Sequence, residues 1–336
     1  MQTREKLLEL LEAHRGAYLS GETIARTLSL SRSAIWKAVK ALQNEGYAIA
    51  AVNNKGYCLL EQNDIISAQG IQKYLRPQLA GLDITVLPTV SSTNTFLRER
   101  AGSGAPEGCI VLANEQTKGR GRMGRNFFSP PETGIYMSLL LRPGNCMAEQ
   151  ALQITTMAAA AMCEAIDSVS DTEEQAQIKW VNDIYLHEKK VCGILTEGSF
   201  SLENGMLEYA VLGLGINIYP PKQHFPVELE ALAGTLFQLQ KNDVKNRLAA
   251  EFLNRFYDYY ARFACSDYIE EYRRRCFVIG KQVLLQSARQ TKSAVVLDID
   301  DRCRLLVRYE DGTEEACSSG EIRIKGEKVY SDCLYR

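Results

Sequence analysis

The sequence predicts an α+β fold made of three consecutive parts. Three helical patterns and a hairpin pattern fill the first 60 residues, which is the order of a winged helix-turn-helix. Consecutive strands mixed with helices follow, which favours a mixed sheet with helices on one face. Short alternating segments end the chain and favour a small β-barrel. We therefore expect domains at residues 1–62, 63–272 and 273–336.

Capping residues and a turn mark the elements of the first part. Residues 3–14 carry four leucines on an apolar helical face. Ser20 and Ser31 each precede a helical pattern and can accept a hydrogen bond from an amide of its first turn, while Gly46 ends the second of these helices. An alternating segment then folds back around residues 53–56, whose Asn-Asn-Lys-Gly sequence is typical of a hairpin turn.

The helix after Ser31 presents a polar and basic outer face. Ile35 and Val39 point inward at helical spacing. The outer face, its flank and the first turn supply the residues that we expect to bind DNA: Ser31, Arg32, Ser33, Trp36, Lys37 and Lys40. The first 60 residues hold eight Lys and Arg against five Asp and Glu, so their net charge is +3, whereas the whole chain has a net charge of −2. This asymmetry favours an anionic partner for the first part. A solvated helix face is the alternative.

Composition excludes several classes of protein. None of the ten cysteines forms a C-x-x-C pair and only three histidines exist, so we expect no metal site built from protein clusters. No run of 18 apolar residues exists, which predicts no membrane span and no membrane partner. The N-terminal segment is charged and amphipathic, unlike a signal peptide. Free thiols in a reducing cytoplasmic location are the expectation.

An unusual loop, Gly-Arg-Gly-Arg-Met-Gly-Arg at residues 119–125, directly follows a predicted strand at 109–116. Glycine lets backbone amides approach an anion closely, and arginine adds paired contacts to phosphate or carboxylate. No G-K-[ST] sequence follows, so the loop is not a Walker A motif. An RNA-binding or disordered loop is the alternative.

Four further stretches carry polar or glycine signals. Residues 91–94 (SSTN) place three hydroxyls and an amide at a helix N-terminus, where a helix cap is the simpler interpretation. Residues 179–183 (KWVND) set a lysine in apolar strand surroundings, where it could hold developing negative charge or only reach solvent. Residues 189–198 (KKVCGILTEG) and 213–217 (GLGIN) put glycines inside strands, which often marks close approach by a ligand.

Taken in order, these motifs resemble those of the biotin–protein ligases. The set is S-T-N, E-Q-x-x-G-R-G-R-x-G-R, K-W-x-N-D, K-x-x-G-I-L and G-x-G-I-N. With the N-terminal winged helix, the chain is similar over nearly its whole length to the class that is both ligase and biotin operon repressor. The resemblance implies a biotin/lipoyl ligase-like central domain and an SH3-like C-terminal barrel. It also implies ATP-dependent synthesis of biotinyl-5'-AMP, with Mg²⁺, and transfer of biotin to a lysine of the biotin carboxyl carrier protein of acetyl-CoA carboxylase.

The resemblance also implies roles for individual residues. The implied biotin-binding residues are Ser92, Thr93, Asn94, Gln116, Gly119, Arg120, Gly121, Arg122, Lys179, Gly193 and Gly215. The implied ATP-binding residues are Arg122, Arg125, Asn217 and Phe225. Lys179 and Arg122 would be catalytic, with Lys179 at the biotin carboxylate and the bridging oxygen of the mixed anhydride. A water-sensitive adenylate needs a closing lid, which a glycine-spaced loop can supply.

The class further implies a homodimer when ligand is bound, with two winged helices on two-fold operator DNA. This sequence departs from the common pattern at Met123, which replaces an arginine, at Val181, which replaces a proline, and at Phe127, where tryptophan is common. The alternatives are a biotin-sensing regulator without ligase activity and a lipoate–protein ligase. The intact Lys179 and Arg122 argue against the first alternative, and the arginine loop argues against the second.

Overall fold

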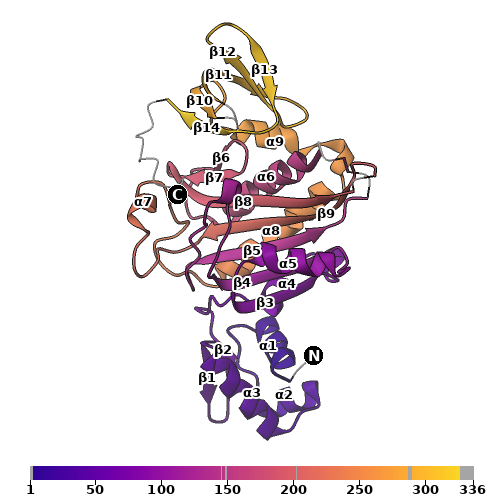
Figure 1. Cartoon of the computed structure of the whole chain (residues 1–336). Coiled ribbons are helices and arrows are strands. Elements are labelled where there is room, and N and C mark those ends of the chain that lie inside the picture. Colours follow the sequence, from indigo (N-terminus) through magenta and orange to yellow (C-terminus); the bar gives the residue numbers. More distant parts are fainter. Residues whose placement is uncertain (1–2, 145, 148–149, 202, 287–289, 326–336) are drawn as a thin grey trace. The chain divides into compact units, whose positions relative to one another are not determined.

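A computed structural model describes residues 3–144, 146–147, 150–201, 203–286 and 290–325 (Figure 1). The chain divides into two compact units. The first contains Met1–Ala80 with Leu239–Glu251, and the second contains Gly81–Gln238 with Phe252–Arg336. Helix α8 (Val244–Tyr260) begins in the first and ends in the second. The boundaries of the three predicted domains stay a prediction.

The first unit contains the predicted winged helix-turn-helix. Its elements are α1 (Thr3–Ala13), α2 (Gly21–Leu28), α3 (Arg32–Asn44), β1 (Ile49–Val52) and β2 (Gly56–Leu59), with the two strands antiparallel. Both predicted caps are confirmed: the hydroxyl of Ser20 accepts from the amide of Thr23 at 3.0 Å, and that of Ser31 accepts from Ala34 at 3.2 Å. These bonds satisfy amides that a helix leaves unpaired at its start.

Apolar residues of these helices form the core of the first unit. The fully buried members include Leu7, Ile24, Ile35 and Leu42. Gly56 is required at the hairpin: its φ is +101°, and a Cβ there would lie 2.0 Å from the carbonyl oxygen of Leu19. The core and the hairpin together hold α3 with one face buried and the other exposed.

The segment that follows supplies short helices, α4 (Ala68–Gln72) and the 3₁₀ helix η1 (Pro77–Leu79). The sequence predicts one helix here, capped by Ser67 and running to Leu75. Ser67 does cap α4 through the amide of Gly70, but α4 ends at Gln72. Gly70 lies so close to Asn246 of α8 that a Cβ would be 2.5 Å from its side-chain nitrogen. This contact packs α4 against the start of α8.

Four charged side chains of the first unit meet in its interior, and we call them the four-charge cluster: Glu12, Arg15, Lys73 and Asp243. Arg15 contacts Glu12 at 2.7 Å and Asp243 at 2.8 Å, and Lys73 contacts the same carboxylates at 3.1 and 2.7 Å. Burial opposes the charge on Lys73, but the hydrogen bond to Asp243 and the nearby Glu12 carboxylate raise the pKa of Lys73 above its ordinary value. The cluster joins α1, the residue after α4 and the residue before α8.

A seven-stranded mixed sheet forms the centre of the second unit, with the strand order β3-β4-β5-β9-β8-β7-β6 (Figure 1). Its strands are β3 (Asp83–Val90), β4 (Cys109–Gln116), β5 (Gly134–Leu141), β6 (Gln177–Lys179), β7 (Asp183–Leu186), β8 (Lys189–Phe200) and β9 (Leu207–Asn217). The β3–β4 pair is parallel and the other pairs are antiparallel. The predicted mixed sheet is thus confirmed.

The prediction that helices cover one face of this sheet is wrong. Consecutive residues of a strand point to opposite faces, and on β8 the hydroxyl of Thr196 bonds that of Thr155 in α6 (Ala151–Val169). Its neighbour Glu197 accepts from Asn94 in α5 (Thr93–Gly102). Helices therefore lie on both faces. The physical reason is visible in β5, all of whose residues are buried, so that each face of the strand requires cover.

Some helical boundaries differ from the predictions. The apolar pattern of the sequence predicts helices at residues 147–169 and about 243–263. The first is α6, which begins only at Ala151, and residues 148–149 lie outside the described residues. The second is α8. Sequence reasoning missed two helices, α7 (Val227–Glu230) and α9 (Tyr268–Arg275), and the predicted boundary at residue 272 lies inside α9. Five of the eight residues of α9 are charged, so its apolar face, which contains the buried Tyr268 and Tyr272, is hard to recognise from the sequence.

The C-terminal segment forms a five-stranded antiparallel sheet with the order β13-β12-β11-β10-β14. Its strands are β10 (Gln282–Gln286), β11 (Thr291–Ile299), β12 (Leu305–Tyr309), β13 (Glu314–Cys317) and β14 (Glu321–Ile324). Strands β13 and β14 lie at opposite edges, and no pairing between them closes the sheet within residues 290–325. The small β domain is confirmed, but a closed barrel is not. The sequence predicts the first strand over residues 283–290 (VLLQSARQ), of which residues 287–289 lie outside the described residues.

The described residues bear on the expectations for membrane spans and for cysteines. None of their helices is both long and apolar enough to cross a membrane. Their nine cysteines are free thiols, and Cys333 lies outside the described residues.

Candidate functional site

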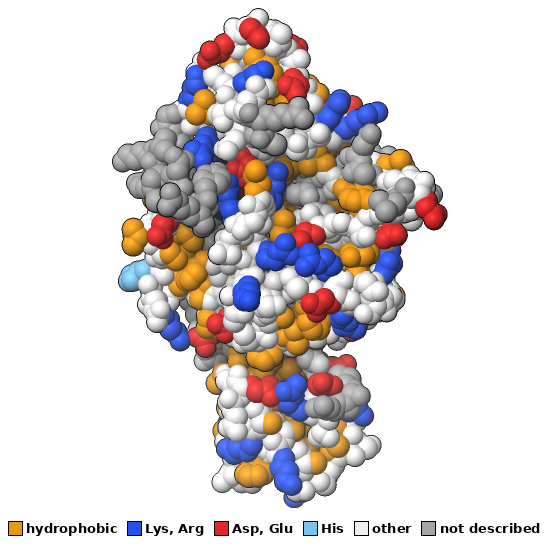
Figure 2. Space-filling view, in the orientation of Figure 1, with side chains coloured by type: hydrophobic (Ala, Val, Ile, Leu, Met, Phe, Trp, Pro, Cys, Tyr) orange, Lys and Arg blue, Asp and Glu red, His pale blue; other side chains and the backbone are white. Residues whose placement is uncertain are grey.

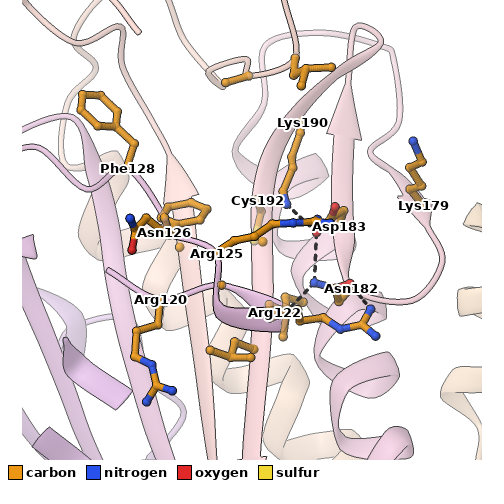
Figure 3. Close-up of a pocket in the computed structure, with 18 of the residues that line it drawn as sticks. Arg120, Arg122, Arg125, Asn126, Phe128, Lys179, Asn182, Asp183, Lys190 and Cys192 are labelled. Carbon is orange, nitrogen blue, oxygen red and sulfur yellow. Dashed lines mark hydrogen bonds and ion pairs between the residues drawn. The ribbon is translucent and has the colours of Figure 1, made fainter. Parts of the chain in front are cut away.

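One face of the central sheet carries a cavity of about 500 Å³, which all the motif stretches help to line (Figure 3). Of the predicted biotin and ATP residues, thirteen line it: Ser92, Thr93, Asn94, Gln116, Arg120, Gly121, Arg122, Arg125, Lys179, Gly193, Gly215, Asn217 and Phe225. Gly119 does not line it. A Cβ at Gly119 would lie 2.3 Å from the carbonyl oxygen of Phe127, so this glycine serves the closure of its own loop.

A hydrogen-bond network occupies one end of the cavity. Gln116 accepts from the amide of Thr93 at 2.9 Å and donates to Ser129 at 3.0 Å. The hydroxyl of Ser138 lies 2.7 Å from that of Thr93 and 2.6 Å from the side-chain oxygen of Asn94. Side chains held in this way are preorganised to bind a small polar group.

Sequence reasoning missed Ser138, which is fully buried on β5. Its signal was a single hydroxyl within the apolar strand sequence GIYMSLLL. A buried hydroxyl requires a hydrogen-bond partner, and the network supplies one.

The strand glycines form the floor of the cavity. Gly193 of β8 and Gly215 of β9 are direct neighbours across the sheet. A Cβ at Gly215 would lie 2.4 Å from the ring of Phe127, and one at Gly213 would lie 2.0 Å from the side-chain oxygen of Asn94. The glycines therefore admit the side chains of Phe127 and Asn94 against the sheet.

The arginine loop, residues 119–125 with the 3₁₀ helix η2 (Arg122–Gly124), directs its three arginines to different partners. Arg120 contacts Glu197 of β8 at 3.0 Å. Arg122 donates to Asn182 at 2.9 Å and to the carbonyl oxygen of Gly320 at 3.3 Å. Figure 3 shows Arg122 directed to Asn182 and Arg120 directed the other way. The loop thus contacts both the central and the C-terminal sheet.

Arg125 reaches the C-terminal sheet as well, because it forms a hydrogen-bonded ion pair with Glu321 of β14. Met123 lies at the outer bend of the loop, with 64% of its surface exposed and a φ of 55°. The departure from the common pattern therefore sits at a solvent-exposed position.

Two lysines line the cavity in different ways. Lys190 contacts Asp183 at 2.7 Å, and its amine lies 3.3 Å from the Cβ position of Gly193 on the cavity floor. Lys179 lies over the ring of Tyr185, 5.6 Å from its centroid. In Figure 3, Lys190 points to Asp183 beside the arginines, while Lys179 stands apart from them.

Lys190 is thus a cavity residue that sequence reasoning missed. The signal was present in the motif KKVCGILTEG, where Lys190 lies three residues before Gly193. An adjacent asparagine, Asn182, links this lysine to the loop: it donates to Asp183 at 3.1 Å and accepts from Arg122.

Asn217 and Phe225 mark another part of the lining. Asn217 donates to the carbonyl oxygen of Gly234 at 3.1 Å. The ring of Phe225 packs edge-on against Phe128 with centroids 6.2 Å apart. The amide of Asn217 therefore ties the end of β9 to the segment after α7, and Phe225 presents an aromatic surface at the rim.

Thiol chemistry finds no basis in the cavity. Burial raises the pKa of the Cys192 thiol far above its ordinary value, which keeps it protonated and unreactive. Among the residues that the structure describes, no group of three His, Cys, Asp or Glu side chains could hold a metal ion.

All six predicted DNA-binding residues are exposed on the first turn and outer face of α3: Ser31, Arg32, Ser33, Trp36, Lys37 and Lys40. Trp36 has 54% of its surface exposed, which is high for a tryptophan. Figure 2 shows blue basic side chains on the visible face of this unit. The surface has the charge and the helix that a major-groove contact requires.

Known proteins resemble each part of the chain. Residues 86–217 match the biotin/lipoate A/B protein ligase family, residues 3–58 match an HTH domain, and residues 278–324 match the biotin protein ligase C-terminal domain. The chain is 33% identical to the bifunctional ligase/repressor BirA of Bacillus spizizenii, over 94% of this chain and 97% of that protein. It is 29% identical to the protein of the same name from Escherichia coli, over 95% and 96%.

A solved structure supports the same relationship. The biotin protein ligase from Aquifex aeolicus in complex with biotin and ATP superposes with a TM-score of 0.59 and 27% identity, covering 72% of this chain and 98% of that one. Together with the near full-length match to the Bacillus protein, this shows that the chain belongs to the biotin–protein ligase family, in its bifunctional ligase/repressor class.

Proposed function

We propose that the protein is an ATP-dependent biotin–[biotin carboxyl carrier protein] ligase that also represses biotin genes. The observation that carries the proposal is the gathering of the family motifs around one cavity, with the arginine loop at its edge. The carrier protein, the loaded homodimer, the cytoplasmic location and the individual residue roles are parts of this proposal.

The polar end of the cavity suits the ureido group of biotin. A ureido group offers N–H donors and one carbonyl acceptor, and the side chains of Ser92, Thr93, Asn94 and Gln116 offer both kinds of partner. Ser92 is buried and makes no capping bond to α5, which supports a ligand-directed hydroxyl. The glycine floor and the Phe127 ring provide apolar surface for the rest of biotin.

Activation joins two anions. An oxygen of the biotin carboxylate attacks the α-phosphorus of ATP, the bond to the bridging oxygen breaks, and pyrophosphate leaves, which gives biotinyl-5'-AMP. Cations must lower the repulsion. We assign Lys179, which lines the cavity, to the biotin carboxylate. Lys190, which is paired with Asp183 beside the floor, would supply a second cation. Arg122 and Arg125 would meet the phosphates, with Asn217 and Phe225 near the nucleotide.

Mg²⁺ commonly binds through substrate phosphates and a small number of carboxylates. The lack of a three-residue acidic cluster among the described residues fits an ion held mainly by ATP. When bound, Mg²⁺ would neutralise phosphate charge. The arginines of the loop would share that task.

Transfer follows when the amine of a carrier lysine attacks the acyl carbon of the adenylate. An amide bond forms, the bond from the acyl carbon to the phosphate oxygen breaks, and AMP leaves while the amine releases a proton. Water would destroy the adenylate, so the loop must cover it. Loaded subunits would then pair and present two α3 helices to operator DNA.

The direct test is incubation of the protein with biotin, ATP, Mg²⁺ and a biotin carboxyl carrier domain, followed by a streptavidin blot. Labelling that requires ATP supports the ligase function. Attachment of lipoate in place of biotin, or binding of biotin without any transfer, would overturn it. Operator binding that does not respond to biotin and ATP would overturn the repressor function alone.

A further inference from the structure

Glu197 of β8 is a carboxylate that collects three donors from two parts of the site. It accepts from the side-chain nitrogen of Asn94 at 3.0 Å and from Arg98 at 3.2 Å, both on α5. It also contacts Arg120 of the arginine loop at 3.0 Å. Only 20% of its side chain is exposed. Donors from α5 and from the arginine loop therefore converge on one largely buried carboxylate.

The first consequence concerns the orientation of Asn94. This side chain is buried, and its oxygen accepts from Ser138 at 2.6 Å while its nitrogen also reaches the carbonyl oxygen of Leu195 at 3.3 Å. An ionised carboxylate can only accept, so Glu197 requires the nitrogen of Asn94 on its side. Without that charge, the Ser138 hydroxyl and the long bond to the Leu195 carbonyl are the contacts left to oppose a reversed amide.

The second consequence concerns the arginine loop. The Arg120 side chain is 41% exposed and Glu197 is its only ion-pair partner among the described residues. Arg120 thereby ties the start of the loop to the strand that forms the cavity floor. The same carboxylate thus fixes one residue of the polar end and one residue of the lid.

We propose that Glu197 is a positioning residue that couples the biotin pocket to its lid, by orienting Asn94 and anchoring Arg120. This rests on the proposed function, since it takes the polar end of the cavity as the biotin end. Loss of the charge weakens biotin binding through Asn94 and loosens the loop through Arg120. The bound nucleotide is not in contact with Glu197 in this scheme, so ATP binding changes little.

The test is Glu197→Gln, which keeps the shape and removes the charge. We expect the KM for biotin to rise about tenfold, the size of a lost charge-assisted hydrogen bond, with kcat and the KM for ATP within about twofold. Tryptic cleavage after Arg120, measured without ligand, becomes several-fold faster. Glu197→Asp, which keeps the charge, gives a smaller rise in the KM for biotin and a smaller increase in tryptic cleavage than Glu197→Gln does.

Arg98→Gln is the matched control, because Arg98 shares the carboxylate but does not line the cavity. It leaves both readouts within about twofold, as expected for an exposed ion pair. A biotin KM in Glu197→Gln equal to that of the unchanged protein, with unchanged tryptic cleavage, would overturn the inference. Failure of the unchanged protein to label the carrier domain would instead overturn the proposed function.

Discussion

Arginines and carboxylates from distant segments meet in two regions of this molecule, but the regions differ in burial. In the four-charge cluster, the side-chain exposures of Arg15, Glu12 and Asp243 are 10%, 1% and 5%. In the arginine loop, Arg120 and Arg125 are 41% and 33% exposed. The first region is enclosed by protein, whereas the second borders a cavity.

This difference separates two uses of the same chemistry. A buried pair cannot lose one partner without leaving an unpaired charge, which is strongly destabilising. A partly exposed pair contributes little to stability and can exchange its carboxylate for another anion. We infer that the cluster is structural and that the loop pairs hold the lid until phosphate replaces them.

The largest effect on stability is expected for Asp243→Asn. The residue has a φ of 54°, which asparagine tolerates, so the substitution removes charge without backbone strain. Arg15 and Lys73 would lose a shared carboxylate, and the first unit should lose about 3 kcal/mol of stability. Urea unfolding measures this, followed by Trp36 fluorescence in a Trp180→Phe background, because the chain has only two tryptophans.

The control for that experiment is Arg4→Gln, which removes an ion pair with Glu45 whose side chains are 42% and 41% exposed. We expect a change below about 0.5 kcal/mol. Equal losses for the two variants would contradict the distinction between buried and exchangeable pairs.

The largest effect on catalysis is expected for Lys179→Ala. Removing a cation from the point where two anions meet should slow adenylate formation about 100-fold or more. Biotin-dependent exchange of pyrophosphate into ATP measures this step. Lys190→Ala is the matched comparison and should cost less than about tenfold, because the Lys190 amine is already paired with Asp183. The reverse order would assign the biotin carboxylate to Lys190.

A smaller effect is expected for Glu321→Gln, which frees Arg125 from the C-terminal sheet. The pair is partly exposed, so the KM for ATP should change by less than about fivefold. Tryptic cleavage after Arg125 should become faster, because the loop loses one anchor. No change in cleavage would show that the C-terminal sheet does not hold the loop.

The smallest effect is expected for Met123→Arg, which restores the common pattern of the loop. Met123 is 64% exposed at the bend, and arginine there meets the same backbone conformation. The rate of adenylate formation should stay within about twofold of that of the unchanged protein. The free energy of unfolding should stay within about 0.5 kcal/mol of it. A large gain in either quantity would show that the bend reaches the ligand.

Local sequence signals were sufficient for much of the fold. Ser20, Ser31 and Ser67 cap helices as predicted, because a cap depends on a few neighbouring residues. The motif order predicted which strands border the cavity. Helices on both faces of the sheet, and the open order of the C-terminal sheet, depend on distant packing that no local pattern records.

Residues of the site whose role depends on distant contacts could not be predicted from the sequence either. Gly193 and Gly215 could be named from their unusual places in strands, but Lys190, Ser138 and Glu197 could not. Their importance comes from what they meet: Asp183 on the neighbouring strand, the network at the start of α5, and the arginine loop. Gly119 shows the opposite case: it belongs to a motif, but it packs against the backbone of Phe127 and does not line the cavity.

The most direct test of the exchangeable lid is the rate of tryptic cleavage after Arg120, Arg122 and Arg125 in the unchanged protein. With biotin, ATP and Mg²⁺ the account predicts cleavage at least about tenfold slower than without ligand, as the adenylate replaces the carboxylate partners and orders the loop. Lipoate with ATP should give no protection. A cleavage rate unaffected by biotin and ATP would contradict the account.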